Sequence, residues 1–192
     1  MPHIVAYPDV ERVLTGQGLV CVYPNSGAFA FPSDAATHVL AWVGPDDPTI
    51  RPAARPFVRQ VDPPYVTELA GRLVRGWREA FGGGDAWLMP KSHWAYELEF
   101  GSDAWMPDAL AAIGVDPAPL RSMNSGAAIA FKPDEAVALR SFAEQLLTRL
   151  DGSDFLLALP GHPVVCTVHH HQQLWWVTTD ERAWEALTTI SR

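Results

Sequence analysis

The C-terminal part of the chain carries its clearest strand pattern. An apolar run that follows Asp154 stops at Pro160-Gly161, a β-branched run covers Val164–Val168, and a third run begins at Leu174 after a polar His/Gln step. Short apolar runs bounded by turn residues are typical of β-strands. The pattern predicts three short strands within residues 154–178.

Two longer stretches have the helical repeat instead. Pro63-Pro64 opens a segment to about Phe81 with one apolar face, and Pro133 opens a second segment to Leu150. Shorter helices are predicted over 8–15, 34–42, 107–113 and 180–190, and further strands over 19–23, 28–31, 87–89, 93–100 and 105–106. Prolines between residues 44 and 64 exclude a helix and a central strand there, so we expect a surface excursion with an edge strand near 57–61.

The order of these elements indicates an internal duplication. Asn25-Ser26-Gly27 and Asn124-Ser125-Gly126 each precede an apolar run, and a long helix and further strands follow both. The pattern predicts an α+β fold, mainly an antiparallel β-sheet with two long helices packed on it, in pseudo-twofold halves. We expect one compact domain over 1–192, with two similar halves, 19–115 and 120–192, as the alternative division.

Composition limits the classes of function. The chain has 192 residues, of which 48% are hydrophobic, and a formal net charge of −8. These values exclude wholesale disorder, and an acidic chain without Lys/Arg runs is a poor match for nucleic acid. Without a secretory signal or a long apolar run, we expect a soluble cytoplasmic protein with no membrane partner. Its two cysteines are then expected to be reduced, and most of its eight tryptophans to lie in the core.

The first candidate site lies in the predicted strand 93–100. Strand side chains alternate, so His93, Glu97 and Glu99 would share one face. One imidazole and two carboxylates are suited to binding a divalent metal or to acid/base chemistry. The simpler alternative is a strand with one solvent-facing side.

The second candidate site is the run His169-His170-His171. In an extended strand His169 and His171 project together, and two imidazoles at that spacing can share a zinc ion, with a third ligand from His93, Glu97 or Glu99. If His170 to Gln173 instead forms a hairpin turn, we expect the side chains to splay and no site to form.

Other catalytic signatures are absent from the sequence. Ser26 and Ser125 lie in Asn-Ser-Gly turns without the surroundings of a nucleophile elbow, and Cys166 lies in an apolar run where a thiol stays inert. No phosphate-binding loop, dinucleotide fingerprint, His-Glu-x-x-His or EF-hand pattern is found.

Two functions follow from these features. The first is a soluble, non-enzymatic binding or regulatory protein with a protein partner, such as an immunity or antitoxin-like module, with no cofactor. Its binding residues would be His93, Glu97, Glu99, His169, His171 and Trp175. The alternative is a metal-dependent hydrolase or metal-binding protein, with His169 and His171 as ligands of a divalent metal such as zinc. A small-molecule pocket lined by Trp87, Trp94 or Trp175 is a third interpretation.

Overall fold

An antiparallel β-sheet forms the centre of the molecule. The computed structural model describes residues 1–32, 57–60 and 65–190, and within them seven strands form the main sheet. In spatial order these are β1 (His3–Val5), β6 (Ala128–Phe131), β5 (Ala86–Pro90), β7 (Phe155–Ala158), β8 (Val164–His169), β9 (Gln173–Thr178) and β4 (Phe57–Gln60). All neighbouring strands run antiparallel. A separate two-stranded sheet pairs β2 (Val20–Cys21) with β3 (Phe29–Ala30).

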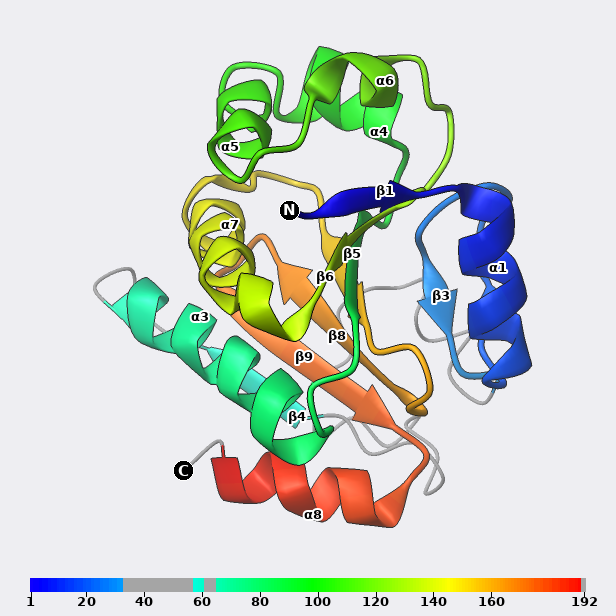
Figure 1. Cartoon of the computed structure of the whole chain (residues 1–192), viewed down its shortest axis with the longest axis vertical. Helices are drawn as coiled ribbons and strands as arrows, with labels where there is room; N and C mark the ends of the chain where they lie inside the picture. The colour runs from blue at the N-terminus through cyan, green and yellow to red at the C-terminus, as the bar shows by residue number, and fades with distance from the viewer. Residues whose placement is uncertain (33–56, 61–64, 191–192) are drawn as a thin grey trace.

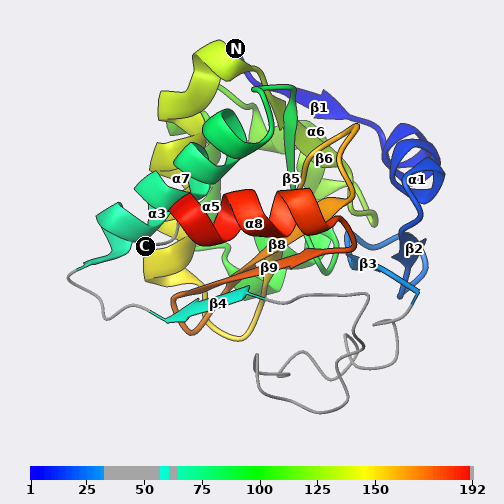
Figure 2. The same cartoon turned by 90° about the horizontal axis from the view of Figure 1, so that it is seen from below.

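Helices cover both faces of the main sheet and one of its ends (Figures 1 and 2). They are α1 (Tyr7–Gly16), α3 (Val66–Arg75), η2 (Gly76–Ala80), α4 (Trp94–Tyr96), η3 (Glu97–Gly101), α5 (Met106–Ala112), α6 (Pro117–Arg121), η4 (Pro133–Glu135), α7 (Ala136–Arg149) and α8 (Glu181–Ile190). Helices α3, α7 and α8 lie on one face, and α1 lies on the other together with β2 and β3 (Figure 1). The segments α4 to α6 cap the end of the sheet where β5 finishes.

The sheet separates two hydrophobic cores. The larger core joins α3, α7 and α8 to one face of the strands, through residues such as Leu73, Phe142 and Phe155. The smaller core packs α1 and the small sheet against the opposite face, through residues such as Val10, Phe29 and Leu156. Alternate residues of each strand point to opposite faces, so one strand contributes to both cores.

Many predicted elements are confirmed. The α+β class with an antiparallel sheet is correct, and the three strands within 154–178 occur as β7, β8 and β9. Helices occupy both predicted long segments, but several other helices occur, so a sheet with two long helices is too simple. The edge strand near 57–61 is β4, at the end of the strand order. The predicted helix over 34–42 lies outside the described residues.

Two predicted strands are wrong. Residues 94–100 are helical, in α4 and η3, and Trp105 leads directly into α5. The alternation of large and polar residues suggested a strand, but Trp94 and Leu98 are the buried pair and are four residues apart. That is the spacing of neighbours on a helix face, and it leaves Tyr96 and Phe100 exposed.

The two Asn-Ser-Gly turns lie against each other. The backbone N–H of Gly126 donates to the carbonyl of Asn25 at 2.7 Å, and a Cβ at Gly126 would overlap the backbone of Gly27. However, the strand after the first turn, β3, belongs to the small sheet, whereas β6 belongs to the main sheet. The internal duplication is therefore not confirmed and stays a prediction.

No helix among the described residues is long and apolar enough to cross a membrane. Both cysteines are free thiols, with Cys166 buried and Cys21 partly exposed. Four tryptophans, Trp77, Trp87, Trp94 and Trp176, are buried in the core.

Candidate functional site

A polar cluster lies where three neighbouring strands end. Lys91 follows the last residue of β5, Asp154 precedes the first residue of β7, and His169 is the last residue of β8. The backbone N–H of Lys91 donates to the Asp154 carbonyl at 2.9 Å, which extends the β5–β7 pairing by one step. By the two-residue repeat of a strand, all three side chains fall on the face that carries the smaller core.

The carboxylate of Asp154 is the centre of this cluster. Its Oδ1 accepts the backbone N–H of His170 at 3.1 Å and lies 2.9 Å from His170 Nδ1. Because an ionised carboxylate can only accept, His170 Nδ1 is the donor, and this leaves Nε2 as the proton-accepting nitrogen of the neutral ring. Asp154 therefore fixes both the tautomer and the orientation of His170.

His169 is the buried histidine of the cluster, and its ring stacks on two neighbouring rings. Its ring is fully buried and stacks on Trp175, with centroids 4.6 Å apart and planes 5° apart, and on His170, with centroids 4.3 Å apart. Its Nδ1 accepts the backbone N–H of His171 at 3.1 Å, which places the proton of the neutral ring on Nε2. Burial lowers the pKa of His169 to about 4, although the Asp154 charge acts in the opposite direction. His169 is therefore neutral at pH 7.

Lys91 is the cation of the cluster. Its Nζ lies 3.9 Å from Asp154 Oδ2, which is an ionic contact and too long for a hydrogen bond. Burial lowers the pKa of the Lys91 amine, and the Asp154 charge offsets part of this effect. The Lys91 side chain is 13% exposed, so it is largely shielded from solvent.

Glu97 lies beside the cluster as a fully buried carboxyl group. Hydroxyl groups of Ser92, Ser102 and Ser153 donate to it. Burial raises the pKa of Glu97, while the serine hydrogen bonds act to lower it and the charge of Asp154 adds to the rise. Two of these serines are sequence neighbours of Lys91 and Asp154.

The predicted site residues are only partly brought together. His93, Glu97 and Glu99 do not share a strand face. His93 precedes the helical segment 94–101, and within that segment Glu97 is buried and Glu99 is exposed. Glu97 nevertheless reaches the edge of the cluster through its serines. Trp175 lies within the cluster by its contact with His169.

The histidine run forms a turn, yet its side chains do not splay. Strand β8 ends at His169, and His170 to Gln172 form the turn. Gln172 adopts the left-handed conformation, with φ of 61°, which allows the chain to reverse tightly. The three imidazoles still gather, with one ring nitrogen of each within 4.8 Å of the others. The expectation that a turn would disperse them is wrong, because stacking on Trp175 holds His169 and the Asp154 carboxylate holds His170.

Sequence reasoning missed two members of the cluster, Lys91 and Asp154, and included His170 only as part of the histidine run. They belong to no spaced motif, and only the pairing of β5, β7 and β8 brings them together. The available signal was positional, since each stands directly at or beside the end of a predicted strand.

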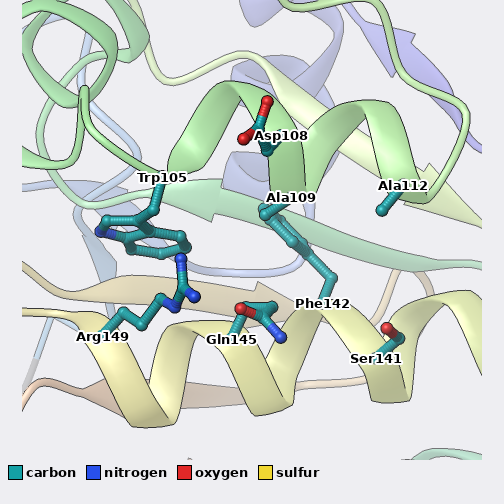
Figure 3. A pocket seen from close by; sticks show the side chains of 8 residues that line it. All are labelled: Trp105, Asp108, Ala109, Ala112, Ser141, Phe142, Gln145 and Arg149. Carbon is teal, nitrogen blue, oxygen red and sulfur yellow. The ribbon is translucent and has the colours of Figure 1, made fainter.

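A second hollow lies away from this cluster, between α5 and α7 (Figure 3). It has a volume of about 250 Å³. Its lining includes Trp105 and the α5 residue Asp108, and the guanidinium carbon of the α7 residue Arg149 lies 5.9 Å from the centroid of the Trp105 ring. Asp108 and Arg149 are exposed, and no polar side chain of this hollow is buried. The polar cluster around Asp154 is therefore the stronger candidate site.

Comparison of the chain with protein-family models, curated proteins and solved structures found no match.

Proposed function

We propose that the cluster around Asp154 is an acid/base catalytic site. The observation that supports it is the contact of 2.9 Å between His170 Nδ1 and Asp154 Oδ1. A histidine oriented by a carboxylate is a common general base, because the carboxylate fixes the tautomer and stabilises the imidazolium that forms. In this proposal His170 is the base, Asp154 is its orienting group, and Lys91 is the neighbouring cation.

The chemistry follows from these three roles. His170 Nε2 takes a proton from water or from the substrate, and the proton stays on the imidazolium until it passes to a leaving group or to solvent. The Lys91 ammonium lies beside the base and favours an anionic substrate or negative charge that develops during the reaction. His169 and Trp175 contribute by holding the stacked ring of His170 in place. This arrangement suits hydrolysis, or proton abstraction next to a carbonyl group, on a small anionic substrate.

A panel of activated carboxylic and phosphoric esters tests the proposal. Wild-type protein should hydrolyse at least one of them, and His170→Ala should lose about 10²–10⁴-fold of that rate, the usual contribution of a general base. His171→Ala is the matched control in the same turn and should keep the wild-type rate. A wild-type protein inert on the whole panel, or an unaffected His170→Ala variant, contradicts the proposal.

Metal binding is the second candidate function, supported by the gathering of three imidazole nitrogens within 4.8 Å. His170 is suited to be a metal ligand, because its Nδ1 contacts the Asp154 carboxylate and ligating histidines usually donate their other ring N–H to a carboxylate. His169 fits less well: its Nδ1 lone pair accepts from the His171 amide and its ring is nearly parallel to that of His170, so the two rings do not converge on one ion. When bound, zinc would supply a polarised water as nucleophile.

Elemental analysis of untagged protein separates the two candidates. About one equivalent of zinc, iron or manganese that is lost in a His169→Ala/His171→Ala double variant favours the metal. Hydrolysis that persists in metal-free protein and in His171→Ala favours the acid/base site.

A protein partner stays a prediction, and one surface feature supports it. Tyr96 and Phe100 are 49% and 74% exposed, and their rings lie 6.3 Å apart on the same helical segment. Exposed neighbouring aromatics are common in protein interfaces. Affinity capture with wild-type protein and with a Tyr96→Ser/Phe100→Ser variant tests this: a partner retained only by the wild type supports it, and capture of no stoichiometric partner counts against it.

A further inference from the structure

We infer that Glu97 is a positioning residue, which holds Lys91 and Asp154 in register through the serines beside them. This inference rests on the proposed role of Asp154 as the orienting group of His170. Glu97 itself contacts neither His170 nor Lys91 in any hydrogen bond among the described residues, so it acts through its neighbours.

Glu97 connects the two loops that carry the site. Ser92, directly after Lys91, donates its hydroxyl to Glu97 Oε1 at 2.6 Å. Ser153, directly before Asp154, donates to Oε2 at 3.0 Å. One side chain therefore joins the segment after β5 to the segment before β7, at the level where the two functional side chains leave the sheet.

The helical segment anchors Glu97 in turn. Ser102 donates its hydroxyl to Oε2 at 3.2 Å, and its backbone N–H donates to the Glu97 carbonyl at 2.8 Å. A Cβ at Gly101 would lie 3.1 Å from Oε2, so the chain at this position approaches the carboxyl group closely. Glu97 thus transmits the position of η3 to the end of the sheet.

The cost of this arrangement argues for a role beyond packing. A carboxyl group with no solvent exposure is expensive to bury, and three hydroxyl donors only partly replace its hydration. An apolar side chain would fill the same space without that cost. With its two oxygen atoms, the carboxyl group of Glu97 binds both loops and the helix at once.

Two substitutions separate positioning from a purely electrostatic role. Glu97→Gln keeps the shape, and serine hydroxyls can both donate and accept, so the same contacts re-form without the negative charge. Glu97→Ala removes the connection between the loops. Glu99→Ala is the matched control, because Glu99 lies in the same helical segment and is exposed.

The measurement is the imidazole Nδ1–H proton of His170 in ¹⁵N-labelled protein at neutral pH, assigned by its disappearance in His170→Ala. This proton is protected from exchange with water only while the Asp154 carboxylate accepts it. We expect the resonance in wild type, Glu97→Gln and Glu99→Ala, and its loss in a folded Glu97→Ala variant. A folded Glu97→Ala variant that keeps the resonance overturns the inference, and so does a Glu97→Gln variant that loses it.

If Glu97→Ala does not fold, Ser153→Ala removes only the arm beside Asp154. We then expect faster solvent exchange of the His170 proton in Ser153→Ala than in Ser122→Ala, an exposed serine with only a local contact. Equal exchange in the two variants overturns the inference. These outcomes are independent of the ester panel: a wild-type protein without activity contradicts the proposed function, whereas the resonance reports on positioning alone.

Discussion

The two faces of the sheet are built from different kinds of residue. In β5, β7 and β8, the face under α3, α7 and α8 carries apolar residues, such as Leu88, Leu157 and Cys166. The other face is apolar beneath α1, but towards the ends of β5, β7 and β8 it carries Lys91, Asp154 and His169. The proposed catalytic site depends on these three polar groups, which lie on one face of the sheet only.

Truncation of the apolar face should have the largest effect. Phe142 on α7 is buried and packs edge-on against Phe155, with ring centroids 6.4 Å apart. Phe142→Ala should lower the free energy of unfolding by about 3–5 kcal/mol, through lost burial and a residual cavity. Urea denaturation measures this, with Val137→Ala, 81% exposed on the same helix, as the control. An equal loss of unfolding free energy in the two variants would contradict the placement of Phe142 in the larger core.

A substitution that disturbs the contact between the two Asn-Ser-Gly turns should cause the next largest loss of stability. A Cβ at Gly126 would overlap the backbone of Gly27, and backbone atoms cannot move aside as a flexible side chain would. Gly126→Ala should therefore cost about 2–3 kcal/mol, near the upper end for overpacking. Gly16→Ala is the control, because nothing lies within 4 Å of its added Cβ. A melting temperature of Gly126→Ala equal to that of Gly16→Ala would show that the turns do not touch.

Neutralising the Asp154 carboxylate should lower the free energy of unfolding less than the two preceding substitutions do, but it should strongly lower the rate of hydrolysis. Asp154→Asn keeps the size but weakens the bonds to His170 and leaves Lys91 without its counter-charge. We expect a loss of about 1.5 kcal/mol, the lower end of the range for a hydrogen bond to a charged group. Hydrolysis in the ester panel should fall as far as in His170→Ala. Full activity in Asp154→Asn would remove the orienting role of the carboxylate.

The smallest expected effect is a pH dependence of the free energy of unfolding that comes from the buried carboxyl group of Glu97. The pKa of Glu97 is raised on folding, so the folded state binds its proton more tightly than the unfolded chain. The stabilising contribution is fully present below the unfolded pKa of about 4.3 and is lost as pH rises through the folded pKa. The stability of wild type relative to Glu97→Gln should therefore fall as pH rises above about 4.3. Glu99→Gln, at an exposed position of the same helical segment, is the control, and urea denaturation at several pH values measures the difference.

Sequence patterns predicted the fold better than the site. The strands β7, β8 and β9 were predictable because apolar and β-branched runs are separated by Pro160-Gly161 and the polar histidine turn. The segment 93–100 was not, because a strand repeat and a helix repeat both fit its short run of alternating large residues. Burial of Trp94, whose indole N–H donates to the Ala127 carbonyl at 2.6 Å, decided in favour of the helix.

The polar cluster depends on contacts that no local pattern encodes. Lys91 and Asp154 are adjacent only because β5 pairs with β7, a connection that spans several intervening helices. His169 and Trp175, by contrast, are close in sequence and belong to one hairpin, so they were recognisable as candidates. The sequence did not indicate that the carboxylate of Asp154 orients His170.

The strand order also bears on how the chain assembles. Strands β7, β8 and β9 follow one another in sequence and in space, whereas His3 pairs with Ala130 and Phe57 with Trp176. Closing such distant pairs costs chain entropy before any contact is gained, so local pairings form first. We therefore expect the three-stranded meander to form first and the outer strands β1 and β4 to join later. Amide hydrogens of β8 should accordingly exchange with solvent more slowly than those of β1, and the polar cluster would take shape only when β5 docks on a meander already formed.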